Sequence, residues 1–424
     1  MRAIAWLLAL FGVAVAVALL VGNNQGTVTV FWPPYRVDIS LNLVLLSTVL
    51  LFVVLHLALK ALSALFSMPQ QAQRWRLQQK ERATHAALLD AFSHMLAGRF
   101  LRARKAAEIA LRQEKALLTS GHPLAHADKL RAISHLVTAE SAQALQDKAT
   151  RDTHLQLALE NTVQRDTQET REGVQLRAAR WALDDRDADA ALQWLDALPQ
   201  GAARRTLALR ARLKATRLAR QPLQALETAR LLAKHRAFSP AAAQSILRGL
   251  ALELVNGAHD PAQLQRAWIQ LESTERLMPD VAIQAAQRLA LLQGDVALAR
   301  QWLLPVWEQL VEHPEQEHVF EIKLVRALEA GFASPDSAMD LPWLHRIEAA
   351  QQRNPRDASL QYLAGMACLR HQLWGKAQQL LTQSLHQLDD VELRRSAWRA
   401  LADLAEQRGD TQAAQQAYKQ VAAV

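Results

Sequence analysis

The chain begins with two apolar runs, Ala3–Gly22 and Leu41–Leu59, and neither run contains a charged residue. Each is close to the ~20 residues that a helix needs to cross the roughly 30 Å hydrocarbon core of a bilayer. We therefore expect two transmembrane helices, joined by a loop over residues 23–40, and a membrane anchor over residues 1–62. A cleaved signal peptide is the alternative for the first run, although that run is longer than the roughly 7–15 apolar residues of a typical signal peptide.

Beyond residue 62 the apolar residues recur at spacings of three and four, and short polar breaks interrupt them every 15–20 residues. The spacing is typical of amphipathic helices, and breaks at this interval are typical of helix–turn–helix units that stack in an array. Ala, Leu, Gln and Arg, which favour helices, dominate the composition. The pattern therefore predicts an all-α protein in which residues 63–424 form one helical repeat domain.

The clearest repeat unit lies near the C-terminal end. Small residues at Ala402 and Ala414 let two helices approach closely, and Trp398 and Tyr418 fill the gaps between neighbouring helix pairs. Gly409 suits the left-handed conformation that ends a helix. This arrangement resembles the tetratricopeptide repeat (TPR), so we expect a TPR-like α-solenoid.

Four further segments show the same pattern with less regularity. The step from Ala377 to Ala414 is 37 residues, so we expect degenerate repeats. Two prolines within Ala333–Pro342 mark the best candidate for an internal break of the array. The matching residues are Gly365, Ala377, Leu381 and Ser384 in one unit, with Trp374 and Gly375 at its turn; Ala286, Ala290, Gly294, Asp295, Ala299, Leu303 and Val306 in a second; Ala179, Ala182, Asp187, Ala191 and Leu195 in a third; and Ala91, Gly98, Phe100, Ala103, Ala107 and Ala110 in a fourth.

The net charge of +8 is concentrated just after the second apolar run, where residues 60–115 hold eleven basic side chains and four acidic ones. The loop at 23–40 carries only Arg36 and Asp38. Because positive charge is retained on the cytoplasmic side, we expect a two-pass protein of the inner membrane with both termini in the cytoplasm. A basic patch confined to this stretch favours contact with anionic lipid over binding to nucleic acid.

The loop between the two runs has β-prone alternation over Thr27–Trp32 and Tyr35–Ile39, with two prolines between them. This predicts a short hairpin at the membrane surface. Trp32 and Tyr35 suit the membrane–water interface, where an amphipathic ring has one wet edge. The hairpin is interpreted as an interfacial cap, and a ligand-binding loop is the alternative.

The sequence lacks the motifs of familiar enzymes. Its 14 glycines contain no G-x-G pair, and neither a P-loop, a G-x-S-x-G elbow nor an H-E-x-x-H zinc motif occurs. Cys368 is the single cysteine, so no intrachain disulfide and no cysteine-based metal site can form. We expect a protein that is not an enzyme and has neither a metal centre nor a resident cofactor.

Histidines are the residues with the best claim to ligand chemistry. His122 and His126 stand four apart, a spacing that on one helix can bind a metal or haem iron. Pro123 between them favours the alternative that they flank a helix start as solvated residues. His56 lies near the end of the second apolar run, where an ionisable group suggests function. With His94, these histidines are the candidate haem ligands.

In TPR arrays the first helix of each unit lines a concave surface that binds peptides or partner proteins. Three of the residues that we expect to line this surface are arginines, and they favour an acidic partner segment through charge-assisted hydrogen bonds. A merely solvated face is the alternative. Carried over through the three clearest units, the groove positions are Gln284, Arg288, Tyr362, Met366, Arg370, Arg399 and Asp403.

The loop sequence Gly26–Ser40 and the stretch Ala91–Ala107, between two apolar runs and TPR-like repeats, are similar to the HemY family. These are proteobacterial inner-membrane proteins associated with haem biosynthesis. The resemblance implies a membrane-anchored scaffold whose protein partners are enzymes of late haem (porphyrin) synthesis. Direct haem or porphyrin binding or trafficking is the alternative, and an assembly scaffold for another envelope pathway is a further one.

Overall fold

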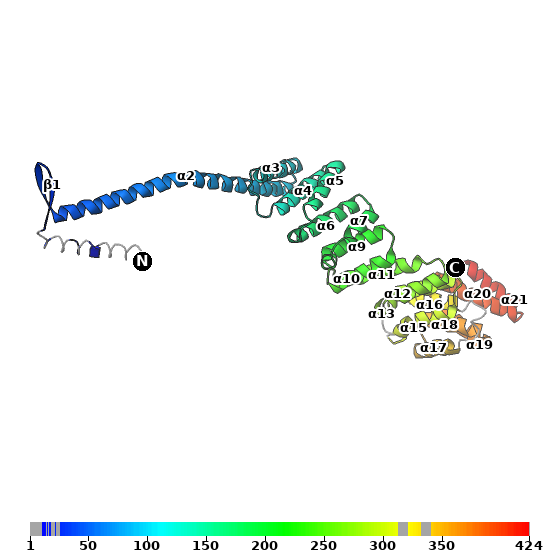
Figure 1. The fold of residues 1–424 in the computed structure, drawn as a ribbon. Coiled ribbons are helices and arrows are strands. Elements are labelled where there is room, and N and C mark those ends of the chain that lie inside the picture. The colour runs from blue at the N-terminus through cyan, green and yellow to red at the C-terminus, as the bar shows by residue number, and fades with distance from the viewer. Residues whose placement is uncertain are drawn as a thin grey trace. The chain divides into compact units, whose positions relative to one another are not determined.

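The computed structural model describes residues 11–13, 15, 17, 22, 26–312, 321–331 and 341–423. Most of the first apolar run, and most of the predicted break at 333–342, lie outside the described residues. The chain is mostly helical and divides into two compact units, Met1–Thr167 and Gln168–Val424 (Figure 1).

The first unit consists of one β-hairpin followed by helices. Leu117, Leu124 and Leu130 of its helical part form a small core, against which Leu77 packs. Its elements are β1 (Thr27–Trp32), β2 (Tyr35–Ser40), α2 (Leu41–Leu96), α3 (Phe100–Thr119), α4 (Ala127–Ala144), α5 (Lys148–Glu160) and the short 3-10 helix η1 (Arg165–Thr167).

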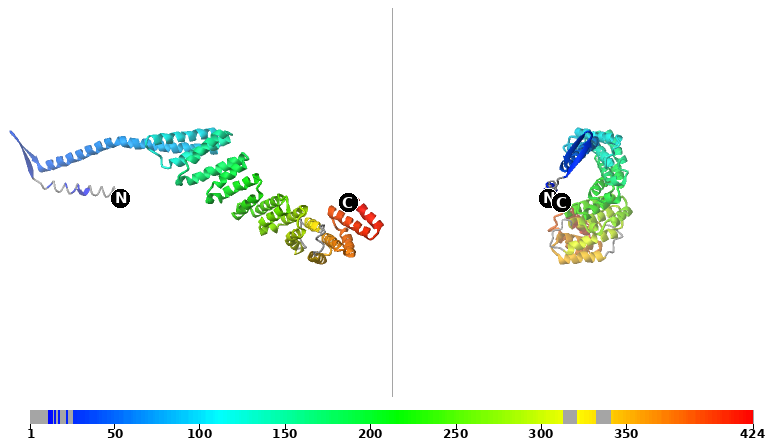
Figure 2. Two further views of the ribbon diagram at one scale, coloured as in Figure 1. Left: turned by 45° about the vertical axis from the view of Figure 1, so that its right-hand side comes forward. Right: turned by 60° about the vertical axis from the view of Figure 1, so that its left-hand side comes forward.

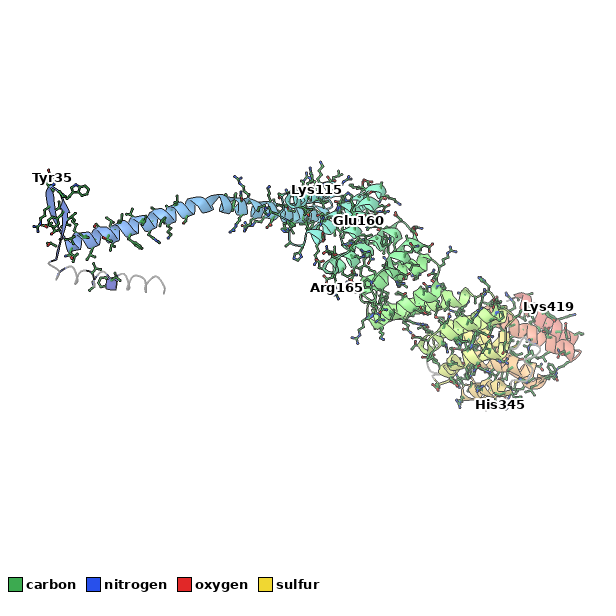
Figure 3. All side chains as sticks on the ribbon, viewed as in Figure 1. Tyr35, Lys115, Glu160, Arg165, His345 and Lys419 are labelled. Atoms are coloured by element: carbon green, nitrogen blue, oxygen red, sulfur yellow. The ribbon has the colours of Figure 1, made fainter. Side chains whose placement is uncertain are left out.

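The predicted hairpin over the loop is confirmed. Strands β1 and β2 pair antiparallel, from Thr27 opposite Ser40 to Trp32 opposite Tyr35. The Thr29 hydroxyl donates to Asp38 across the pair at 2.6 Å. Tyr35 and Trp32 are more than 70% exposed at the free end of the hairpin (Figure 3).

Helix α2 joins the second apolar run to the repeats without interruption. Its first part, Leu41–Ser63, has a mean hydropathy of 2.4 and no buried residue, and it is the one helix in the described part of the chain that is long and apolar enough to cross a membrane. The helix then continues to Leu96. The expected boundary between anchor and repeat domain at residue 62 therefore falls inside a continuous helix.

The second unit is a row of helices. Successive helices pair as hairpins, α6 with α7, α9 with α10, α14 with α15, α18 with α19 and α20 with α21, and the hairpins stack side by side (Figure 2). The helices are α6 (Gln168–Asp184), α7 (Ala188–Asp196), α8 (Gln200–Ala203), α9 (Thr206–Leu218), α10 (Pro222–Lys234), α11 (Pro240–Asn256), α12 (Pro261–Gln270), α13 (Ser273–Arg276), α14 (Pro279–Leu291), α15 (Val296–Glu312), α16 (Glu321–Gly331), α17 (Leu341–Arg353), α18 (Ala358–Arg370), α19 (Trp374–Ser384), α20 (Val391–Gln407) and α21 (Thr411–Ala423).

The packing of these hairpins uses small and large residues in the way the repeat pattern predicts. Gly365 of α18 is buried, and a Cβ atom placed on it would lie 2.8 Å from the Leu381 Cγ of α19. Between hairpins, the Trp268 and Trp302 rings stack with their centroids 4.6 Å apart. The close approach of two helices at a glycine and the stacking of aromatic rings between neighbouring helix pairs both stabilise the array of hairpins.

The turns inside the hairpins close with a residue in the left-handed conformation. Gly409 has a φ of 76°, as predicted, and Gly98 has a φ of 71°. At most other turns the left-handed residue is not glycine, as in Gln372 before α19 and Gln293 before α15. Trp374 and Gly375, expected at a turn, are instead the first residues of α19.

Candidate protein-binding surface

The first helices of the last three hairpins in the second unit, α14, α18 and α20, form a continuous row together with α11 and α16. Helix α11 contacts α14, α14 contacts α16, α16 contacts α18, and α18 contacts α20. The seven predicted groove residues lie on three helices of this row, Gln284 and Arg288 on α14, Tyr362, Met366 and Arg370 on α18, and Arg399 and Asp403 on α20. Helix α16, which sequence reasoning left unassigned, lies between α14 and α18.

The two predicted residues on α14 are engaged within the protein. The Gln284 amide donates to the Asn256 side-chain oxygen at 2.8 Å. Nε and Nη2 of Arg288 both donate to the Ala258 carbonyl, at 3.2 and 2.8 Å. Both side chains hold the end of α11 and the loop after it, so a partner would have to compete with these bonds.

Tyr362 does not belong to an accessible surface, which corrects its prediction as a groove residue. It is fully buried. Burial raises the pKa of the Tyr362 phenol, and the nearby Glu329 carboxylate of α16 raises it further. Burial also raises the pKa of Glu329, against the opposing charges of Arg326 and Arg370. Tyr362 and Glu329 thus form a polar centre beneath the row, which the repeat motif did not indicate.

The accessible part of the predicted surface lies on α18 and α20. Arg370 and Arg399 are exposed, whereas Met366 is half-buried. Within the part of the chain that the structure describes, neither guanidinium makes an ion pair or a hydrogen bond. Asp403 is exposed and accepts a hydrogen bond from the Tyr418 hydroxyl at 3.1 Å. Arg399 and the exposed part of Arg370, whose charge also acts on the buried Glu329, are therefore accessible to an anionic partner.

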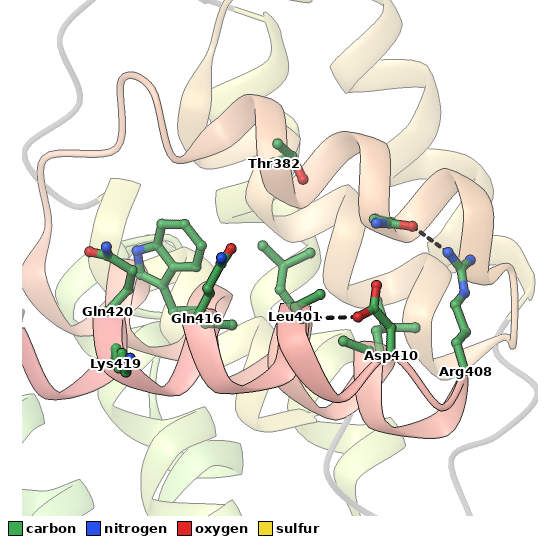
Figure 4. Close-up of a pocket in the computed structure, with 13 residues that line it drawn as sticks. Thr382, Leu401, Arg408, Asp410, Gln416, Lys419 and Gln420 are labelled. Carbon is green, nitrogen blue, oxygen red and sulfur yellow. Dashed lines mark hydrogen bonds between the residues drawn. The ribbon is translucent and has the colours of Figure 1, made fainter.

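A cleft with a volume of ≈ 420 Å³ is lined by residues of α19, α20 and α21 (Figure 4). Trp398 and Leu401 of α20 line it, and Arg408 donates to the Gln378 side chain at one end. Asp410 lines it as well and accepts a hydrogen bond from the Ala413 backbone N–H. Because α19 and α21 are second helices, this cleft differs from the row that carries Arg370.

The structure brings together none of the four candidate haem ligands. His56 lies on the apolar part of α2 and His94 near the end of the same helix. His126 has a φ of 62° and precedes α4, so it shares no helical face with His122. Both histidines are exposed and precede α4, so the helix start lies after the pair and not between its two members. No group of three or more potential metal-ligating side chains occurs among the described residues.

A different histidine pair, missed by sequence reasoning, lies between α4 and α5. The Nδ1 atoms of His135 and His154 are 2.9 Å apart. Burial, together with smaller contributions from the charges of His154 and Arg131, lowers the pKa of His135 to about 4. Burial and the charge of Arg104 lower the pKa of His154. Both rings are therefore neutral at pH 7, and one donates to the other.

This pair predicts a loss of stability in acid. Because the folded-state pKa of His135 lies below its usual 6.5, the unfolded chain binds the proton first, so stability is complete above pH 6.5 and falls as the pH decreases toward 4. We expect a decrease of about 1.5 kcal/mol, less than half of the full linkage value, because partial exposure screens the charge. Urea unfolding of the full chain in detergent should show this slope, and His135→Asn should flatten it. An unchanged slope in the variant would contradict the assignment.

The row of hairpins and the apolar helix of the first unit define a helical-repeat protein that carries one helix of membrane-spanning length and hydropathy in its described part. Residues 26–146 match the family model described as HemY protein N-terminus. This match spans β1 to α4 and confirms the family resemblance. Together with the apolar helix, it points to a membrane protein. No curated protein matches the chain.

The comparison with solved structures found matches that include two helical-repeat proteins. The P58(IPK) TPR domain is 13% identical at a TM-score of 0.22, and the match covers 77% of this chain and 99% of that one. The structure of Naa15/Naa10 bound to HypK-THB is 12% identical at a TM-score of 0.25, and the match covers 80% of this chain and 59% of that one.

Proposed function

We propose that this protein is a membrane-anchored adaptor that binds partner proteins through the row of first helices in its second unit. The observation that carries the proposal is the pair of exposed guanidinium groups of Arg370 and Arg399 on adjacent helices of a repeat array. Arginine forms strong, often bidentate hydrogen bonds with carboxylates, so an acidic partner segment suits this surface. The adaptor acts by raising the local concentration of its partners and catalyses no reaction itself.

The proposed setting is the inner membrane, with two spans and with both termini in the cytoplasm. The excess of basic residues after Leu41–Ser63 supports this orientation. The HemY N-terminal match supports partners among the enzymes of late haem biosynthesis. A reporter fused after Val424 tests the topology, and its activity is expected only on the cytoplasmic side.

Site-specific cross-linking in cells tests the binding surface. A photo-crosslinking amino acid placed at Arg370 or Arg399 should capture partner proteins, which mass spectrometry then identifies. The matched control is the same amino acid at Gln383, an exposed position on the second helix α19. With the cross-linker at Met366, the double variant Arg370→Glu, Arg399→Glu should lower the yield at least tenfold, since the loss of even one charge-assisted hydrogen bond of about 1.5 kcal/mol lowers the affinity about tenfold.

Two results would refute the proposed surface. Equal capture at Gln383 would show that the row of first helices has no special role. An unchanged yield after the double charge reversal would show that the guanidinium groups do not hold the partner. If the captured proteins belong to another envelope process, the proposed adaptor role stands and the proposed role in haem biosynthesis is refuted.

A further inference from the structure

A basic cleft of ≈ 680 Å³ lies in the first unit, where α2 enters the helical fold. One wall is α2, and the other is the turn that follows α3. Its lining contains cationic and hydrogen-bonding side chains and no carboxylate. The lining residues are Gln73, Arg74, Arg76, Leu77, Lys80, Ser120 and His122.

The cleft is a consequence of how α3 ends. Gly121 has a φ of 76°, a conformation that favours glycine, and the His122 backbone N–H then donates to the Leu117 carbonyl at 3.1 Å. This turn directs the chain back toward α2 and places His122 at the cleft. On the other wall, Leu77 packs against the core that includes Leu117. This contact fixes the position of α2 relative to the turn.

The cations of the cleft differ from other arginines of the same unit. Arg104 pairs with Glu108 at 3.1 Å, and Arg131 pairs with Asp128 and Glu114. By contrast, the exposed side chains of Arg74, Arg76 and Lys80 form no ion pair within the described part of the unit. Three positive charges gathered at one concavity without counter-charges favour an anionic ligand.

The position of the cleft along α2 indicates where that ligand comes from. The apolar helix ends at Ser63, and the uncharged sequence continues to Gln73. At about 1.5 Å per residue, Arg74 follows Ser63 by about 16 Å along the helix axis. The headgroup layer accounts for roughly 5–8 Å of this, and long basic side chains reach back toward the interface. Helix tilt shortens the remainder, so the cleft lies within about a Debye length of the bilayer surface.

We propose that this cleft binds the phosphate headgroup of an anionic phospholipid. The Arg74 and Arg76 guanidinium groups and the Lys80 ammonium group donate to the phosphate oxygens, and His122 closes the site from the α3 side. The Ser120 hydroxyl already donates to the Leu117 carbonyl at 2.8 Å, so its oxygen is left to accept from a headgroup hydroxyl. The binding of one lipid headgroup would fix how α2 leaves the membrane. This inference rests on the proposed membrane anchor.

The test uses the full chain in nanodiscs of phosphatidylcholine with a minor fraction of phosphatidylglycerol. Native mass spectrometry after transfer to detergent measures the phosphatidylglycerol retained on each protein. The triple variant Arg74→Gln, Arg76→Gln, Lys80→Gln should lose about tenfold or more of this lipid, since each cation near an anionic surface contributes about 1 kcal/mol. The matched control, Arg99→Gln, Arg102→Gln, Lys105→Gln, removes the same charge from exposed positions outside the cleft and should retain the lipid.

A second variant separates a built site from general surface charge. His122→Asn leaves the α2 cations in place, and it should still lower retention several-fold. Equal loss in the two triple variants, or no loss in the cleft variant, would overturn the proposal. Displacement of phosphatidylglycerol by inorganic phosphate at low concentration would assign the cleft to a soluble phosphate and overturn the lipid source. Failure of the chain to enter nanodiscs at all would instead count against the membrane anchor.

Discussion

Substitution of Gly365 by valine is expected to destabilise the second unit by about 3 kcal/mol. Even a Cβ atom at this position would lie 2.8 and 2.9 Å from two side-chain carbons of Leu381 and 3.2 Å from its backbone nitrogen. The larger valine therefore forces α18 and α19 apart, and overpacking of this kind costs about 1–3 kcal/mol where backbone has to move. The expected result is a lower urea midpoint and faster amide hydrogen exchange in α18 and α19.

Gly249→Val provides the matched control. Gly249 also lies inside a helix of the second unit, α11, and a Cβ atom there would meet no heavy atom within 4 Å. The control should change the free energy of unfolding by no more than about 0.5 kcal/mol, because only helix propensity changes. Similar destabilisation by both valines would show that the contact of Gly365 with Leu381 is not the cause.

Substitution of Asp390 by alanine is expected to cost about 2–3 kcal/mol. One carboxylate oxygen accepts the Leu393 backbone N–H at 2.9 Å and so caps α20. The two oxygens also accept from Nη2 of Arg326 on α16, at 2.5 and 2.8 Å. Loss of a cap costs about 0.5–2 kcal/mol, and loss of a charge-assisted hydrogen bond adds about 1.5 kcal/mol at a partly exposed site.

Asp410→Ala separates the two contributions. Asp410 accepts the Ala413 backbone N–H at 3.0 Å in the first turn of α21, and no ion pair to it occurs among the described residues. Its loss should cost about 1 kcal/mol. Hydrogen exchange in α20 then measures the link to α16 directly. Equal costs for the two aspartates would mean that Arg326 contributes nothing to the attachment of the last hairpin.

Much of the fold could be predicted because it depends on local patterns. The apolar helix at Leu41–Ser63, the hairpin with its Pro-Pro turn, and the left-handed Gly409 each follow from a few neighbouring residues. The left-handed residues Gln293 and Gln372 could not be identified in this way, although the first lies beside the expected Gly294 and Asp295. There the left-handed conformation is imposed by the packing of two helices on residues that do not favour it.

The candidate site was predicted less well because it depends on contacts between helices. Tyr362 and Met366 are one turn apart on α18, yet Tyr362 is fully buried, whereas Met366 is only half-buried. The Tyr362 phenol lies beside Glu329 of α16, a helix without a clear repeat motif. His135 and His154 likewise meet only because α4 packs on α5, and nothing at their spacing of 19 residues indicates a pair.

The unbroken course of α2 has a consequence for orientation about the membrane normal. An α-helix rotates by about 100° per residue, so the azimuth of Leu77, and with it that of α3 and α4, is set by residues inside the apolar segment. One extra residue after Ser63 would turn these helices by about 100° while leaving every contact among them intact, and seven would nearly restore the original facing. The direction in which the first unit faces along the bilayer is therefore encoded in helical phase.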